Sequence, residues 1–255
     1  MTDSTTRFSN RVENYIKYRP GYPIEVIGLL ARECGLSKDS IIADVGSGTG
    51  ILSEMFLRQG ISVYGVEPNQ DMRGAAERLL KNYPDFTSIN GKAEATTLPD
   101  RGVDFVVVGQ AFHWFDSRAA LREFLRILKP RGWVVLIWNK RRLDSTPFLR
   151  AFEELLLEFG TDYEQVRHEN VEKDIASFFA PEEFNLATFE NLQELDFEGL
   201  KGRLLSASYT PAADHPDYQQ MLDKTREIFL AHQQDDRVFV EYDTKVYFGH
   251  LQVKP

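Results

Sequence analysis

The chain has 255 residues, of which 42% are hydrophobic and 27% are charged, and its formal net charge at pH 7 is -9. Such a chain can bury a sizeable core, and its acidic balance argues against nonspecific binding to nucleic acid or to an anionic membrane. No stretch approaches the ~20 apolar residues of a membrane-spanning helix, and residues 1–10 lack a signal-peptide core, so we expect a cytoplasmic protein. The single cysteine, Cys34, excludes an internal disulfide and a cysteine-based zinc cluster.

The first half of the chain predicts strands alternating with helices. A helix is predicted within residues 22–36, where apolar positions recur at helical spacing and Gly35 can end the helix. Five short apolar segments follow as candidate strands, with amphipathic helical patterns between most of them. These segments are 41–45, 62–66, 86–90, 104–109 and 133–138. The pattern indicates a parallel sheet covered on both faces, with ligands bound at the carboxyl ends of its strands.

The second half has a different pattern. Residues 145–179 are charged and helical in spacing, and they are followed by a partly alternating segment at 187–197 that predicts a strand. Two further helices and a closing strand or hairpin are predicted at 199–208, 216–234 and 237–251. We therefore expect the sheet to resume after a helical insertion that forms a small cap over the ligand cleft.

The segment IIADVGSGTG, residues 41–50, runs from an apolar strand into Gly46, Gly48 and Gly50. A phosphate-binding P-loop requires G-x-x-x-x-G-K-[ST], and no lysine follows these glycines. The dinucleotide fingerprint requires G-x-G-x-x-G, and Ile51 stands where its third glycine would be. The second mismatch is mild, because that glycine serves mainly helix–strand packing.

Two carboxylates narrow the choice of ligand. Asp44, beside the turn, would repel a pyrophosphate but attract an ammonium group. Glu67 ends the second candidate strand, where a carboxylate can accept hydrogen bonds from both ribose hydroxyls at roughly 1.5–3 kcal/mol each. The expected ligand has an adenosine-like ribose and a cationic amine, without phosphate. The plainer alternatives are a tight turn, a capping aspartate and a solvated strand end.

Taken together, the motifs resemble those of the class I S-adenosylmethionine-dependent methyltransferases. ADVGSGTG resembles their first motif, and VYGVEPNQDM resembles their second. GKAEATTLPDRGVDFVVVGQAFHWF resembles the adenine-contacting loop and fourth strand, and ILKPRGWVVLIWN resembles the fifth. The opening RVENYIKYRPGYP and the closing GRLLSASYTP and KVYFGHL resemble small-molecule members, the methyltransferase type 11 or trans-aconitate methyltransferase-like group.

The resemblance implies a fold and a domain plan. The fold would be α/β and Rossmann-like, with a doubly wound, mostly parallel seven-stranded sheet, an antiparallel last strand and a small helical cap insertion. We expect a single domain over residues 1–255. Its parts would be an N-terminal arm and helix (1–36), the cofactor-binding core (40–139), the cap insertion (about 141–183) and the end of the sheet (184–255).

S-adenosylmethionine is the cofactor that the resemblance implies. The glycine turn would line its methionine part, Glu67 would hold the ribose, and Arg19 could bind the carboxylate with two parallel hydrogen bonds. The expected cofactor-binding residues are Tyr18, Arg19, Asp44, Gly46, Ser47, Gly48, Gly50, Glu67, Pro68, Ala93, Glu94, Gln110 and Ala111. Tyr15 could close over the cofactor with Tyr18 and Arg19.

Methyl transfer from a sulfonium needs alignment and exclusion of water more than it needs a base. His113 is the candidate general base, although it could instead pack or contact the cofactor, and Trp114 could wall the acceptor pocket. Arg141 and Arg142 follow the fifth candidate strand and would favour an anionic acceptor such as a carboxylate. A solvated loop is the plainer interpretation of these cations.

The expected function is methyl transfer from S-adenosylmethionine to a small-molecule acceptor, without nucleic-acid or membrane partners and without a metal. The oligomeric state is left open. Two alternatives remain at this point, an NAD(P)-dependent oxidoreductase and a regulatory module that binds the cofactor without catalysis.

Overall fold

The computed structural model describes residues 11–163 and 171–252. Expectations for the beginning of the N-terminal arm and for the middle of the helical insertion lie outside the described residues. The strands are β1 (Ile41–Val45), β2 (Ser62–Val66), β3 (Phe86–Ile89), β4 (Val103–Gly109), β5 (Leu128–Arg141), β6 (Phe184–Leu195) and β7 (Val238–Gly249). They form one seven-stranded sheet in the order β3-β2-β1-β4-β5-β7-β6.

The strand pairing confirms the predicted fold class. β1 pairs in parallel with β2 and β4, β2 with β3, and β4 with β5. β7 lies between β5 and β6 and runs antiparallel to both. From β1 the chain adds β2 and β3 on one side of the sheet, and it then crosses to add β4 and β5 on the other side of β1. The carboxyl ends of β1 and β4 therefore form the topological switch point, where such sheets bind ligands.

Helices follow most of these strands. Their bounds are α1 (Val12–Tyr18), α2 (Glu25–Cys34), α3 (Ile51–Leu57), α4 (Gln70–Leu79), α5 (Ser117–Ile127), α6 (Pro147–Phe159), α7 (Val171–Phe179), α8 (Phe197–Leu205) and α9 (Tyr218–His232). Gly35 ends α2 in the left-handed conformation, as the sequence predicts. The side chains of Asn69 and Asp116 cap α4 and α5 by accepting backbone N–H bonds.

Both faces of the sheet are buried, as its continuous apolar strands require. Along β4, Val106 belongs to the core on one face and Val107 to the core on the other. Phe124 of α5 joins the first core, whereas Phe56 of α3 joins the second. The sheet is therefore covered by helices on both sides.

β5 begins earlier than predicted. The predicted segment is 133–138, but α5 ends at Ile127 and the strand starts at Leu128. Leu128 pairs with Val103, and the register shifts before Phe105 pairs with Trp133. A proline near the beginning of a strand destabilises the sheet little, because no ladder hydrogen bond is required from its missing N–H where the register is interrupted.

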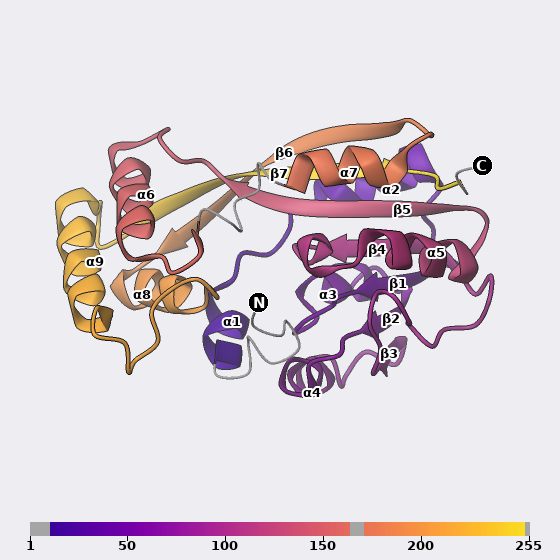
Figure 1. The fold of residues 1–255 in the computed structure, drawn as a ribbon, viewed down its shortest axis with the longest axis horizontal. Coiled ribbons are helices and arrows are strands. Elements are labelled where there is room, and N and C mark those ends of the chain that lie inside the picture. The colour runs from indigo at the N-terminus through magenta and orange to yellow at the C-terminus, as the bar shows by residue number, and fades with distance from the viewer. Residues whose placement is uncertain (1–10, 164–170, 253–255) are drawn as a thin grey trace.

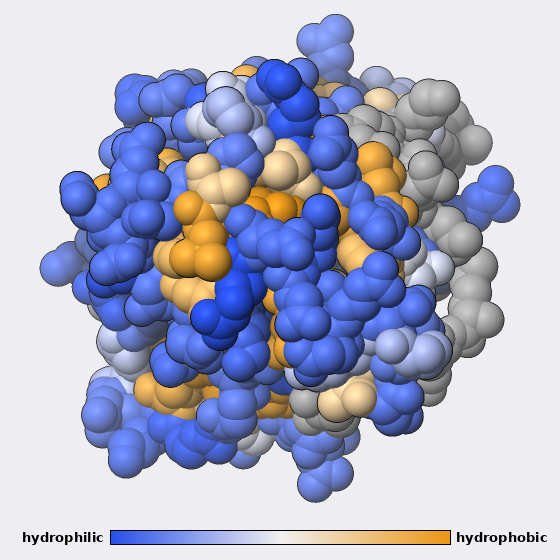
Figure 2. Space-filling view, turned by 90° about the vertical axis from the view of Figure 1, so that its left-hand side faces the viewer, coloured by the Kyte–Doolittle hydropathy of each residue, from blue (hydrophilic) through white to orange (hydrophobic). Residues whose placement is uncertain are grey.

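The helices of the predicted insertion pack in different places. α6 packs with α8 and α9 in a third core at one end of the long strands β5, β6 and β7 (Figure 1). α7 instead contributes Ile175, Phe178 and Phe179 to the sheet core beside α5. The two helices of the expected cap, α6 and α7, therefore pack in different cores. α7 packs on the sheet because it carries an apolar face that the sheet can bury. Figure 2 shows that the end formed by α6, α8 and α9 has a mostly hydrophilic surface with small apolar areas.

In the described ranges, no helix is both long and apolar enough to cross a lipid bilayer.

Candidate functional site

The glycine turn after β1 needs glycine for both conformation and space. Gly46, Gly48 and Gly50 have φ values of 71°, 57° and 86°, in the left-handed region. A Cβ on Gly46 would lie 2.6 Å from the Cβ of Ala111, and one on Gly50 would lie 2.6 Å from Leu80. The turn is therefore packed closely against the segment that follows β4.

Glu67 follows β2 and holds the turn in place. One carboxylate oxygen accepts the backbone N–H of Gly48 at 2.9 Å, and the other accepts that of Asn69 at 2.8 Å. Only 8% of Glu67 is exposed, and burial raises its pKa in spite of these two bonds. Each carboxylate oxygen keeps a further lone pair with which it can accept a ligand hydroxyl.

A pocket of about 260 Å³, which we call the outer pocket, opens at the carboxyl ends of β1, β2 and β4. Its walls combine the glycine turn, the loop after β3 and the segment after β4. It is lined by Tyr15, Gly46, Gly48, Glu67, Pro68, Asn69, Met72, Lys92, Ala93, Glu94, Gly109, Gln110, Ala111, Trp114 and Phe115. Most of the expected cofactor-binding residues, and Trp114, therefore meet in one place.

A smaller inner chamber adjoins the outer pocket and shares four lining residues with it. It is lined by Tyr15, Arg19, Pro20, Tyr22, Asp44, Gly46, Ser47, Thr49, Ile51, Leu52, Gly109, Gln110 and Arg203. Of these, Tyr22, Thr49 and Arg203 were not predicted from the sequence as site residues. The motif GRLLSASYTP drew attention to the segment around Arg203, but nothing in its spacing pointed to a site.

Asp44 is the buried anion of the inner chamber. Ser53 donates its hydroxyl to Oδ2 of Asp44 at 2.6 Å, whereas Oδ1 is buried and accepts no hydrogen bond within the described part of the chain. Burial raises the pKa of Asp44 to about 7; the bond from Ser53 opposes this shift, and the charge of Glu67 adds to it. An ammonium group would satisfy the free oxygen and favour the ionised carboxylate.

α1 covers the chamber and is docked on α8 (Figure 1). Arg19, which follows α1, donates from Nη2 to the backbone oxygen of Ser206 at 2.9 Å. Its Cζ lies 4.8 Å from the ring centroid of Tyr15. Two of the expected cofactor-binding residues lie outside both pockets: Tyr18 packs on Gly202, and Gly50 is the N-cap of α3.

His113 lies on a single 3-10 turn after β4 and lines neither pocket. Its ring centroid is 4.4 Å from that of Trp114 and 5.2 Å from that of Trp138. The structure thus places His113 within an aromatic cluster, and only Trp114 of these three rings lines the outer pocket. Its role as a base stays a prediction.

Arg141 and Arg142 are engaged in ion pairs away from both pockets. Arg141 bonds to Glu153 and to the hydroxyl of Tyr163. Arg142 lies 2.7 Å from Asp243 and 2.9 Å from Glu190, both on neighbouring strands. These carboxylates already balance the two cations, so the arrangement does not favour their expected role in binding an acceptor.

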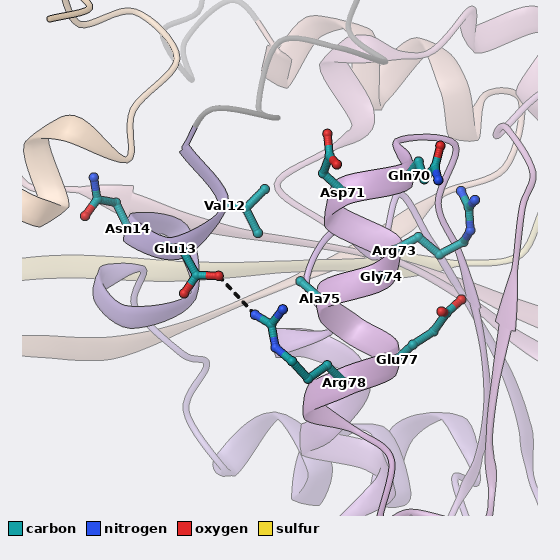
Figure 3. A pocket seen from close by; sticks show the side chains of 10 residues that line it. All are labelled: Val12, Glu13, Asn14, Gln70, Asp71, Arg73, Gly74, Ala75, Glu77 and Arg78. Carbon is teal, nitrogen blue, oxygen red and sulfur yellow. Dashed lines mark hydrogen bonds and ion pairs between the residues drawn. The ribbon is translucent and has the colours of Figure 1, made fainter.

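A third hollow, of about 620 Å³, lies between α1 and α4 (Figure 3). Glu13 points across it to Arg78, at 3.0 Å. Arg73 turns back to the carbonyl oxygen of Glu67, at 3.0 Å. The charged residues that line this hollow therefore hold α1 and the end of β2 in place.

Among the described residues, no group of three potential metal ligands is found.

The comparisons with known proteins agree with this geometry. Residues 43–136 match the family model of the methyltransferase domain. Together with the relatives below, this match supports a class I S-adenosylmethionine-dependent methyltransferase and confirms the resemblance predicted from the motifs. The family that this model describes implies binding of S-adenosylmethionine, the predicted cofactor.

Two relatives and two solved structures illustrate the similarity. An uncharacterised methyltransferase of Schizosaccharomyces pombe is 34% identical over 150 residues, which is 58% of each chain. One of Mycobacterium tuberculosis is 28% identical over 90% of this chain and 88% of that protein. A candidate type II methyltransferase of Anaeromyxobacter dehalogenans has a TM-score of 0.65 at 19% identity, covering 91% of this chain and 97% of that one. A candidate antibiotic-pathway methyltransferase of Anabaena variabilis has a TM-score of 0.63 at 21% identity, covering 92% and 99%. These two structures share the fold.

The residues present fit the implied cofactor. The free Oδ1 of Asp44 suits a methionine ammonium group, and the carboxylate of Glu67 has lone pairs left for ribose hydroxyls. The close approach at Gly46, where a Cβ would collide with Ala111, lets a ligand lie against the backbone.

Proposed function

We propose that this protein transfers a methyl group from S-adenosylmethionine to a small-molecule acceptor by in-line displacement. The observation that carries the proposal is the pair of joined cavities, with Glu67 in the outer pocket and the free oxygen of Asp44 in the inner chamber. A small acceptor is favoured because α1 and α8 cover the inner chamber, which leaves little room for a folded macromolecule.

Each cofactor contact is proposed from its place in the cavities. Glu67 would hold the ribose, Ala93 and Glu94 the adenine edge, and Asp44 the ammonium group. Arg19 would bind the carboxylate. When bound, S-adenosylmethionine supplies an activated methyl group on a sulfonium leaving group.

Gln110 is proposed to position the reacting groups. It has a φ of 60°, and its side-chain nitrogen lies 3.5 Å from the carbonyl oxygen of Asn139. A left-handed backbone costs a non-glycine residue on the order of 1 kcal/mol, so the packing around β4 must hold it there. This conformation presents Gln110 to both cavities at the point where they join.

The remaining chemistry is alignment and exclusion of water. Tyr15 and Tyr22 wall the inner chamber, and Trp114 would wall the acceptor side of the outer pocket. Good alignment can lower a barrier by up to ~7–11 kcal/mol. His113 stays the candidate base, required only for an acceptor that arrives protonated.

We also propose that the chain acts as one domain. β5 and β7 pair continuously from the parallel core to the end where α6, α8 and α9 pack. Two units joined through unbroken strands cannot separate without losing ladder hydrogen bonds. A cytoplasmic location stays a prediction.

Calorimetry with S-adenosylhomocysteine tests the proposed function. The wild-type protein should bind it, and Glu67→Gln should bind about tenfold or more weakly. The reason is that the new amide would turn its N–H₂ toward a backbone N–H and would lose the negative charge. Glu77→Gln, a change at an exposed glutamate of α4, is the matched control and should bind normally.

Two results would contradict the proposal. One is a folded wild-type protein that ignores S-adenosylhomocysteine, above all if NADH stabilises it instead, which would favour an oxidoreductase. The other is equal affinity for the cofactor product in wild type and Glu67→Gln. Binding without turnover on any acceptor would favour the regulatory module.

A further inference from the structure

Two arginines, Arg19 and Arg203, line the inner chamber. Burial and then the neighbouring charge of Arg203 lower the pKa of Arg19. Within the described part of the chain, neither side chain forms an ion pair with a carboxylate. Two partly buried cations without counterions are costly, which indicates that a ligand supplies the negative charge.

Arg203 is held with its outer nitrogens free. Its Nε donates to the hydroxyl of Tyr242 at 3.2 Å, and that hydroxyl donates to Oε1 of Gln193 at 3.2 Å. Gln193 in turn donates from Nε2 to the carbonyl oxygen of Tyr18 at 2.8 Å. No other hydrogen bond of this guanidinium is formed within residues 11–163 and 171–252. The Nη1 and Nη2 donors therefore have no hydrogen-bond partner among the described residues, and Arg203 lines the chamber in which a ligand could accept from them.

The charges of the chamber do not balance with the cofactor alone. In the proposed arrangement, Asp44 meets the ammonium group and Arg19 meets the carboxylate. The sulfonium and Arg203 then remain as two positive charges in one partly buried space. A second anionic group beside Arg203 would reduce this excess and would lie next to the reacting methyl group.

We propose that Arg203 binds a carboxylate of the methyl acceptor, so that the substrates of this enzyme are small organic acids. The inference rests on the proposed function. A planar guanidinium matches a planar carboxylate with two parallel hydrogen bonds, and Arg203 lines the chamber that adjoins the outer pocket. Arg203 comes from α8, far along the chain from the cofactor motifs.

The test titrates the protein saturated with S-adenosylhomocysteine with acetate, succinate and citrate. Succinamide and inorganic phosphate serve as neutral and non-carboxylate probes. At least one acid should bind the wild-type complex, and Arg203→Gln should weaken that binding about tenfold or more. Arg203→Lys should have an intermediate effect, because lysine keeps the charge but not the planar fork. Lys201→Gln, the same charge change two residues earlier on α8, should bind the acid as wild type does.

The affinity for S-adenosylhomocysteine itself separates this inference from the proposed function. It should change less than threefold in Arg203→Gln, and a loss of about tenfold or more would show that Arg203 serves the cofactor and would overturn the inference. Unchanged acid binding in Arg203→Gln, phosphate binding in place of the acids, or no acid binding by wild type would also overturn it. Failure of wild type to bind S-adenosylhomocysteine would instead refute the proposed function. If Arg203→Gln does not fold, as its melting curve would show, the same criteria apply to Arg203→Lys.

Discussion

Asp44 is a buried carboxylate whose ionised form the fold disfavours. Its side chain is fully buried, and its one hydrogen-bond donor among the described residues, Ser53, reaches only one oxygen. Burial raises its pKa to about 7, well above the value of 3.8 for a solvated aspartate. The unfolded chain therefore loses the Asp44 proton near pH 4, whereas the folded chain keeps it until about pH 7. Between these values the folded state binds more protons, so this residue makes stability fall as the pH rises.

Asp44→Asn should remove that dependence. We expect the variant to be more stable than wild type at pH 8 by roughly 1–4 kcal/mol, and the difference to shrink toward pH 4. Urea denaturation at pH 5 and pH 8 measures both values. The same variant should bind S-adenosylhomocysteine poorly, since a neutral amide cannot balance an ammonium charge. A variant less stable than wild type at pH 8 would contradict this account.

At the residue scale, the site was predictable where it is local in the sequence. Asp44 and Glu67 end strands beside a glycine turn, and such positions follow from short-range patterns. Arg203 was missed because only the docking of α8 brings it to the chamber. The sequence did not indicate that Arg142 would pair with Asp243, which lies 101 residues further along and becomes its partner through strand pairing.

At the element scale, α1 depends on α8. A seven-residue helix is too short to be stable in water by itself, so α1 needs its packing partners. A Cβ built on Gly202 would lie 2.0 Å from the ring of Tyr18, so the two helices approach as closely as a glycine allows. Because α1 carries Tyr15 and leads into Arg19, this contact sets the position of one wall of the chamber.

Gly202→Ala should loosen that wall. The added methyl group would displace the ring of Tyr18, so we expect faster amide exchange in α1 and weaker S-adenosylhomocysteine binding, by roughly three- to thirtyfold. Exchange monitored by mass spectrometry and calorimetry measure the two effects. Lys201→Ala, a change at the preceding residue of the same helix, whose side chain pairs with Glu198, is the control and should show neither. Normal exchange in α1 of the Gly202→Ala variant would show that the helices can adjust without separating.

At the scale of the whole molecule, the sheet joins the cofactor-binding core to the helical end. The tryptophans Trp114, Trp133 and Trp138 all lie in or beside the parallel core, so their fluorescence reports on that part. Circular dichroism also reports on α6, α8 and α9. If the continuous strands make one cooperative unit, both signals should change together.

Saturating ligand should therefore raise the melting temperature by the same amount whether it is followed by tryptophan fluorescence or by circular dichroism. S-adenosylhomocysteine at about 100 times its dissociation constant adds about 2.7 kcal/mol, which corresponds to ~5–11 °C in the melting temperature, at ~2–4 °C per kcal/mol for a chain of this size. Two separate transitions, with only the fluorescence transition shifted by the ligand, would refute the proposal of a single domain.

The sequence by itself determined the alternating strands and helices, the glycine turn and the two carboxylates beside it, because all of these depend on neighbouring residues and on regular periodicity. Only the tertiary structure decided that α7 covers the sheet, that Arg141 and Arg142 are neutralised by carboxylates, and that Arg19 and Arg203 face one chamber. These features depend on contacts between residues far apart in the chain. Burial and charge balance at such contacts arise only when the chain has folded.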